Sequence, residues 1–105
     1  MSKVHVRLAD WHKDNAALRR IREAVFINEQ SVAPELEWDS EDSQAIHFLA
    51  LEDDYPIGTA RLLSDGHIGR VSVLRDWRGL KVGERLMQAA IAEAAIASPG
   101  ETRRD

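Results

Sequence analysis

The chain has 105 residues, 44% of them hydrophobic and 30% charged, and its formal net charge at pH 7 is −4. This length allows one domain of ordinary globular composition, and the acidic balance argues against nucleic acid as the main partner. The absence of cysteine excludes disulfides, thiolate metal sites and cysteine nucleophiles, and we expect a cytoplasmic protein because the sequence shows neither a signal peptide nor an apolar stretch long enough to span a membrane.

Hydrophobic periodicity predicts a strand and a helix in the first part of the chain. Residues 4–9 alternate between apolar and mostly polar side chains, which is typical of a strand with one buried face. Asp10 is a candidate cap for a helix that runs to about Ile27 with one apolar face. Residues 28–44 contain a proline and a cluster of acids, and they predict a loop.

Three strands and a second helix are predicted in the remaining sequence. The strands, at 45–52, 57–64 and 67–74, are joined by short connectors, which favours an antiparallel meander. The helix at 82–97 carries a broad apolar stripe and should pack on the sheet. Residues 98–105 predict a helix stop and a polar tail. The expected fold is of the α/β (α+β) class, in the order β-α-β-β-β-α and with a mixed, mainly antiparallel sheet, and it forms a single domain over residues 1–97.

The segment WRGLKVG, at 77–83, joins the last predicted strand to the last helix. A glycine-containing turn at a helix start presents backbone N–H groups to an anion, commonly a phosphate. The spacing of Gly79 and Gly83 matches neither the dinucleotide fingerprint nor the P-loop. The same two glycines also suit a plain tight turn, so the local sequence leaves both interpretations open.

The order of several blocks resembles the GNAT superfamily of acetyl-CoA-dependent N-acetyltransferases. The pyrophosphate loop of that family, Gln/Arg-x-x-Gly-x-Gly/Ala, resembles residues 78–83, and a typical apolar strand, VSVL, precedes them. The blocks RIREAVFINEQ (20–30), PIGTARL (56–62) and IGRVSVL (68–74) resemble the ElaA-type branch of small bacterial members. The resemblance covers about residues 4–97.

The resemblance implies a site for acetyl-CoA as cosubstrate, with a primary amine of a small molecule or peptide as acceptor and no metal. Backbone groups of two strand residues would hold the pantetheine arm, and the loop would hold the pyrophosphate, with Arg78 adding a charge-assisted contact. The residues implied are Val71, Val73, Arg78, Gly79, Leu80, Lys81, Val82 and Gly83.

Three features depart from the family pattern. Lys81 stands where the family usually has glycine, and we expect it to adopt a right-handed helical conformation in the first turn. Gly69 occupies a position where many relatives carry a glutamate, so no catalytic base is assigned. The family fold continues beyond this helix, and we expect the chain to lack that C-terminal part.

Other polar residues allow structural interpretations beside functional ones. Tyr55, the only tyrosine, is expected in a hairpin corner away from the reaction centre, and Arg61 and Arg70 are expected as exposed strand charges or ion-pair partners. His47 is expected to be a hydrogen-bonded, half-buried imidazole rather than a base. The histidines show no metal-ligand spacing. Glu29 and Gln30 suit either a helix end or an acceptor contact, and the acidic run 37–42 suits a solvated loop or a rim that attracts amines.

Three functions therefore remain open at this point. They are an N-acetyltransferase, a catalytically impaired CoA-binding or self-associating module, and an unrelated α/β interaction domain. The missing part of the family fold would leave strand 67–74 at an open edge, with Val82, Leu86 and Ile91 facing water. Such an edge invites pairing with another chain, so we expect a homodimer or larger homo-oligomer.

Overall fold

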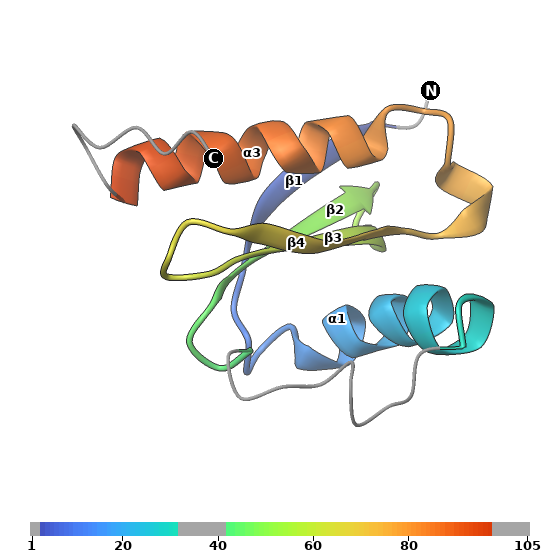
Figure 1. Ribbon diagram of the computed structural model, residues 1–105. Coiled ribbons are helices and arrows are strands. Elements are labelled where there is room, and N and C mark those ends of the chain that lie inside the picture. The colour runs from blue at the N-terminus through green and yellow to red at the C-terminus, as the bar shows by residue number, and fades with distance from the viewer. Residues whose placement is uncertain (1–2, 32–41, 98–105) are drawn as a thin grey trace.

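A four-stranded antiparallel sheet lies at the centre of the computed structural model, which describes residues 3–31 and 42–97 (Figure 1). The strands follow one another in space as they do in sequence: β1 (Val4–Ala9), β2 (Ile46–Glu52), β3 (Tyr55–Leu62) and β4 (Ile68–Val73). The predicted meander is confirmed. Each neighbouring pair of strands is antiparallel. The expected sheet was mixed and mainly antiparallel, whereas the sheet of the described residues is entirely antiparallel.

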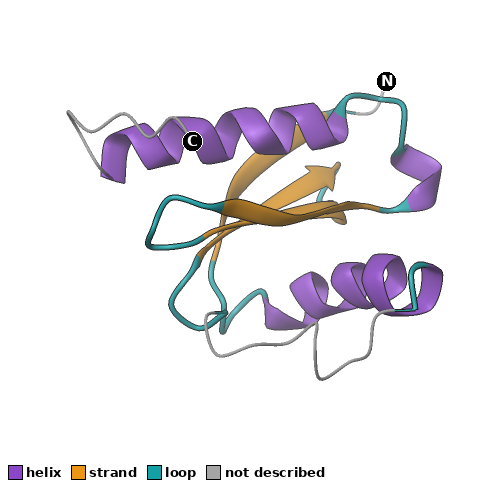
Figure 2. Ribbon diagram, viewed as in Figure 1, coloured by secondary structure: helices purple, strands orange, loops and turns teal. Residues whose placement is uncertain are grey.

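Helices cover both faces of the sheet (Figure 2). The helix α3 (Val82–Ala97) lies on one face, and α1 (Asn15–Arg22), continued by the π-helical turn η1 (Glu23–Glu29), lies on the other. Neither helix of the described segments combines the length and the apolar character that crossing a bilayer requires. The predicted tail at 98–105 lies outside the described residues.

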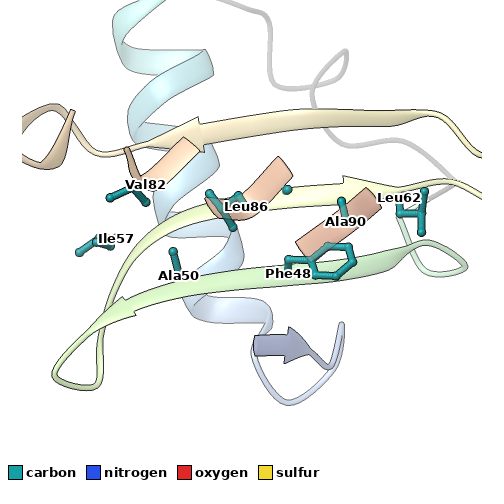
Figure 3. Close-up of a cluster of buried hydrophobic side chains, with 8 residues drawn as sticks. Phe48, Ala50, Ile57, Leu62, Val82, Leu86 and Ala90 are labelled. Atoms are coloured by element: carbon teal, nitrogen blue, oxygen red, sulfur yellow. The ribbon is translucent and has the colours of Figure 1, made fainter. Parts of the chain in front are cut away.

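The larger part of the core lies between α3 and the sheet, where helix and strand side chains interdigitate (Figure 3). Val82 and Leu86 are 1% and 0% exposed, so the expectation that they face water is wrong. The reason is Gly58 of β3: a Cβ there would lie 3.1 Å from Leu86 Cδ1, so the glycine lets α3 approach the sheet closely. Ile91, by contrast, is 56% exposed, as expected.

The smaller part of the core lies under α1, and the helix differs from its prediction. Asp10 Oδ1 accepts the N–H groups of His12 and Lys13, so Asp10 closes a turn and the helix itself starts only at Asn15. At its other end, Gln30 N–H donates to Val25 O five residues back, which is the hydrogen bond of a π-helix. The periodic apolar pattern does not distinguish this widened turn from an α-helix.

Candidate functional site

The turn between β4 and α3 is built from two tight steps. The short 3₁₀ helix η2 (Arg75–Trp77) is closed by Trp77 N–H, which donates to Leu74 O at 2.9 Å. Arg78 then reaches back along the chain, because its Nε donates to Val73 O at 2.9 Å. These two bonds fix the path of the backbone as it leaves the sheet.

Two residues of this turn have left-handed backbone conformations. Gly79 has φ +83° and Lys81 has φ +64°, so the expectation of a right-handed Lys81 is wrong. The first α-helical hydrogen bond of α3 runs from Arg85 N–H to Lys81 O, which places Lys81 at the cap rather than inside the first turn. A position that demands positive φ is the kind that usually holds glycine, and this agrees with the resemblance drawn from the sequence.

A pocket of about 410 Å³ opens at the start of α3. The N–H groups of the first helical turn have no acceptor within the helix, and the helix dipole adds partial positive charge there. Residues 75–85 include four basic and two acidic side chains in a chain of net charge −4. The donors and charges therefore suit an anion the size of a diphosphate. The lining residues are Val73, Trp77, Arg78, Gly79, Lys81, Val82 and Gly83.

This lining brings together most of the residues implied by the sequence. Leu80 lies within the same turn and is 60% exposed, but it does not line the pocket. Val71 lies farther back along β4, outside the lining. Gly83 has space around it, since a Cβ there would meet only Val73 Cγ2, at 3.9 Å.

The edge of β4 leads toward this pocket. Leu74 N–H donates to Ile57 O of β3, so the hydrogen-bonding groups of the preceding residue, Val73, point away from β3 by the alternation of an antiparallel ladder. Among the described residues β4 has no neighbouring strand on that side. The Val73 carbonyl is used by Arg78, whereas its N–H faces the open edge.

A bulge interrupts β4 just before this edge. Thr59 pairs with Ser72 and Arg61 pairs with Gly69, so Ala60 alone opposes two residues of β4. Arg70, one of those two, has φ +51°, and the buried hydroxyls of Thr59 and Ser72 lie 2.6 Å apart beside it. The bulge redirects β4, and a strained non-glycine residue in that place is common near functional sites.

Comparison with known proteins agrees with this architecture. A sequence model of the acetyltransferase (GNAT) family matches residues 7–103. The chain belongs to this family. The family resemblance inferred from the sequence is thus confirmed.

Several GNAT proteins of bacteria are similar to the chain in sequence or structure. It is 33% identical over 78 residues to the uncharacterized N-acetyltransferase YjcF of Bacillus subtilis, a match that covers 71% of this chain and 56% of YjcF. The chain spans about half the length of the curated relatives it matches. Escherichia coli ElaA has 28% identity and a TM-score of 0.78 over 94% of this chain and 74% of ElaA. A Brucella melitensis GNAT acetyltransferase, solved with acetyl-CoA, has a similar fold, with a TM-score of 0.67 at 23% identity over 91% of this chain and 71% of that one.

An aromatic pair flanks the pocket of this GNAT chain, and sequence reasoning did not find it. Trp77 lines the pocket, and its ring centroid lies 5.7 Å from that of Tyr55. Tyr55 is the first residue of β3 and stands at the same end of the sheet as the loop, because β3 and β4 are antiparallel. Tyr55 thus lies beside Trp77, which lines the pocket at the start of α3.

A buried charge cluster lies on the α1 side of the GNAT sheet. Asp42 Oδ1 is 2.9 Å from Arg22 Nη1 and 3.0 Å from Arg61 Nη1, and the three side chains are at most 7% exposed. Arg61 was expected to be either an exposed strand charge or an ion-pair partner. It is an ion-pair partner, and its side chain is buried. Asp42, predicted to belong to a solvated loop or rim, is buried; residues 37–41 of that run lie outside the described residues.

His47 completes this cluster, and its expected structural role is confirmed. His47 Nε2 donates to Asp42 O at 2.7 Å. The imidazole ring stacks on the ring of Trp11, with 4.7 Å between the ring centroids. The imidazole is hydrogen-bonded as expected, but it is only 2% exposed and so is fully buried rather than half-buried. The side chain of Glu29 is not among those that the structure describes, and Gln30 is exposed directly after η1. Contact of either residue with the acceptor substrate stays a prediction.

The backbone at Lys81 provides a test of stability. Lys81→Gly is expected to raise the free energy of unfolding by roughly 0.5–1 kcal/mol. Glycine avoids the penalty of about 1–2 kcal/mol that a Cβ carries at positive φ, but it loses more conformational entropy on folding, which offsets part of the gain. Lys81→Ala, which keeps the Cβ, is the matched control and should bring no gain. Urea denaturation measures both variants, and equal stabilities for glycine and alanine would contradict the left-handed assignment.

His47 provides a test of pH dependence. Burial holds the pKa of His47 below its ordinary value near 6.5, against the smaller opposing effect of the bond to the Asp42 carbonyl. The unfolded chain thus takes up a proton more readily, and the free energy of unfolding should fall as the pH drops below about 6.5. Urea denaturation at pH 7.5 and pH 5 should show a smaller fall for His47→Gln, whereas His5→Gln, on the exposed side of β1, should keep the full fall.

Proposed function

We propose that this chain binds acetyl-CoA and contributes to transfer of the acetyl group to a primary amine of a small molecule or peptide. The observation that carries the proposal is the pocket at the start of α3, where left-handed residues, helix N–H groups and basic side chains gather. Family membership supports the choice of CoA among diphosphate ligands. A cytoplasmic enzyme is part of the same proposal.

Two parts of the chain would bind different parts of CoA: the turn before α3 and the edge of β4. The backbone N–H of Arg78 donates to Arg75 O at 3.2 Å. Within the expected loop 78–83, the N–H groups from Gly79 to Gly83 would therefore hold the pyrophosphate, and the exposed side chains of Arg78 and Lys81 would add positive charge. Val71 and Val73 of β4 would hold the pantetheine arm through backbone groups on the open edge. The bulge at Arg70 would aim this edge at the acetyl end.

The reaction itself is a direct displacement at the thioester. The amine nitrogen forms a bond to the acetyl carbon, the carbon–sulfur bond breaks, one amine proton is lost, and the departing thiolate of CoA is protonated. Catalysis of this kind depends mainly on positioning and proton transfer. We assign no catalytic base or acid to a residue of this chain.

Thermal denaturation with CoA tests the binding step. CoA at about 100 times its dissociation constant should stabilise the fold by roughly 2.7 kcal/mol. A panel of primary amines incubated with acetyl-CoA then tests turnover, measured as release of free thiol. The absence of any thermal shift at millimolar CoA would contradict the proposal.

A second candidate function is a CoA-binding or self-associating module with little or no catalysis. It is favoured by the edge of β4, which has no neighbouring strand on its outer side among the described residues, and by Ile91 of α3, which is 56% exposed. Strand or helix pairing between two copies would cover these surfaces. Light scattering at high micromolar concentration should then give a homodimer or larger assembly with weak turnover, and a stable monomer with rapid turnover would exclude this candidate.

A further inference from the structure

The indole ring of Trp77, in the turn before α3, contacts the end of the hairpin between β2 and β3. Trp77 Nε1 donates to Glu52 Oε1 at 3.1 Å, and the Trp77 ring packs at 34° against Tyr55. Glu52 and Tyr55 face each other as the last pair of the β2–β3 ladder. The two residues that close the hairpin therefore both hold Trp77.

The hairpin end that holds the indole is itself fixed from the other side of the sheet. Arg20 of α1 lies 5.1 Å from the centroid of the Tyr55 ring, and its Nη1 donates to the Tyr55 hydroxyl at 3.3 Å. Its Nη2 donates to Pro56 O at 3.1 Å. The turn between the strands is two residues long, Asp53 and Asp54, and both have positive φ as a tight hairpin requires. Glu52 is thus an acceptor at a well-defined position.

Trp77 transmits this position to the pocket. It lines the pocket, it is the last residue of η2, and it directly precedes Arg78. A rotation of the indole would displace the backbone at Arg78 and the N–H groups that follow. The half-buried indole N–H also needs an acceptor, since a buried donor without one costs about 1–3 kcal/mol.

Glu52 has two properties that act differently at this position: its negative charge and its acceptor oxygen. A carboxylate near an anion site weakens anion binding through its charge, so its position beside Trp77 is unfavourable for a phosphate ligand by electrostatics alone. Its acceptor oxygen, rather than its charge, explains its placement. This distinction separates Glu52→Gln, which keeps an oxygen acceptor, from Glu52→Ala, which removes it.

We infer that Glu52 is a positioning residue for CoA binding, which acts by orienting Trp77 and through it the phosphate-binding turn. The inference rests on the proposed function, because it concerns the affinity of the same pocket. Glu52 lies in the β2–β3 hairpin, outside the loop motif at 78–83. The hairpin would therefore contribute to CoA affinity although it is not part of that motif.

Isothermal titration with CoA, well below the unfolding temperature, tests this inference. Glu52→Ala and Trp77→Phe should each raise the dissociation constant about three- to tenfold, the range expected from one lost hydrogen bond. Glu52→Gln should stay within about twofold of the unaltered chain. The double variant Glu52→Ala/Trp77→Phe should be no weaker than the weaker single variant, because both changes remove the same bond.

Nuclear magnetic resonance of the free protein supplies a readout that does not depend on CoA. The indole N–H resonance that disappears in Trp77→Phe should move in Glu52→Ala and stay nearly in place in Glu52→Gln. A merely structural role for Glu52 predicts a lower melting temperature with unchanged CoA affinity, and that result would overturn the inference, as would additive effects in the double variant. If the unaltered chain binds no CoA while the indole resonance moves as expected, the proposed function fails, the role in affinity fails with it, and only the local contact stands.

Discussion

Gly83→Arg is expected to abolish CoA binding and to leave the fold intact. Gly83 lines the pocket in the first turn of α3, and its nearest non-local neighbour would be 3.9 Å from an added Cβ, which is an ordinary contact. The arginine side chain would occupy the space in which the diphosphate should lie. Because glycine is about 1 kcal/mol less favourable than other residues inside a helix, the melting temperature of the free variant should hold or rise.

Gln88→Arg is the matched control, since it adds the same side chain and charge to an exposed position of α3 outside the pocket. Titration calorimetry should give no detectable CoA binding by Gly83→Arg and nearly unchanged affinity for the control. CoA binding by Gly83→Arg with the affinity of the unaltered chain would place the ligand elsewhere.

Asp42→Asn is expected to cost the fold about 3–5 kcal/mol, the range found when one partner of a buried ion pair is removed. Asp42 is 2% exposed and receives hydrogen bonds from the guanidinium groups of Arg22 and Arg61, which are also buried. Asparagine keeps the shape of the side chain but presents an amide with no charge to two cations. Domains of this size are stable by only about 5–15 kcal/mol, so urea denaturation should show a large shift of the midpoint.

Arg7→Gln is the comparison for an exposed ion pair. Arg7 and Asp14 are 3.1 Å apart, with side chains 45% and 21% exposed, and such pairs contribute about 0.2–1 kcal/mol. A cost of that size for Asp42→Asn as well would mean that the buried cluster contributes little to stability.

The order of elements could be predicted from the sequence because its signals are local. Alternation in the strands, the short connectors between them and the broad stripe of the last helix each depend on neighbouring residues. The connector after β2 is shorter than predicted, because β3 begins at Tyr55 and not at residue 57. The helix boundaries could not, because the start at Asn15 and the π-helical turn depend on hydrogen bonds that periodicity does not encode. The burial of Val82 and Leu86 depends on Gly58, which lies more than twenty residues away in the sequence.

The candidate site was predictable as far as its motif extends. Residues 78–83 follow a recognisable pattern, and most of them line one pocket. The conformation of Lys81 was missed, although the family's preference for glycine at that position was the available signal for positive φ. The contacts of Trp77 with Glu52 and Tyr55, and the burial of Asp42, arise from residues distant in sequence that only the fold brings together.

Titration of the ¹⁵N-labelled chain with CoA, followed by nuclear magnetic resonance, tests most directly whether CoA binds at the turn before α3. The largest chemical-shift changes should fall on the backbone amides of residues 79–84, with smaller changes at Val71 and Val73 and almost none in β1. Gly79 and Gly83 are convenient reporters because glycine amides resonate in a separate region. Millimolar CoA that leaves these amides unmoved, or that shifts amides of α1 and β1 instead, would contradict the account.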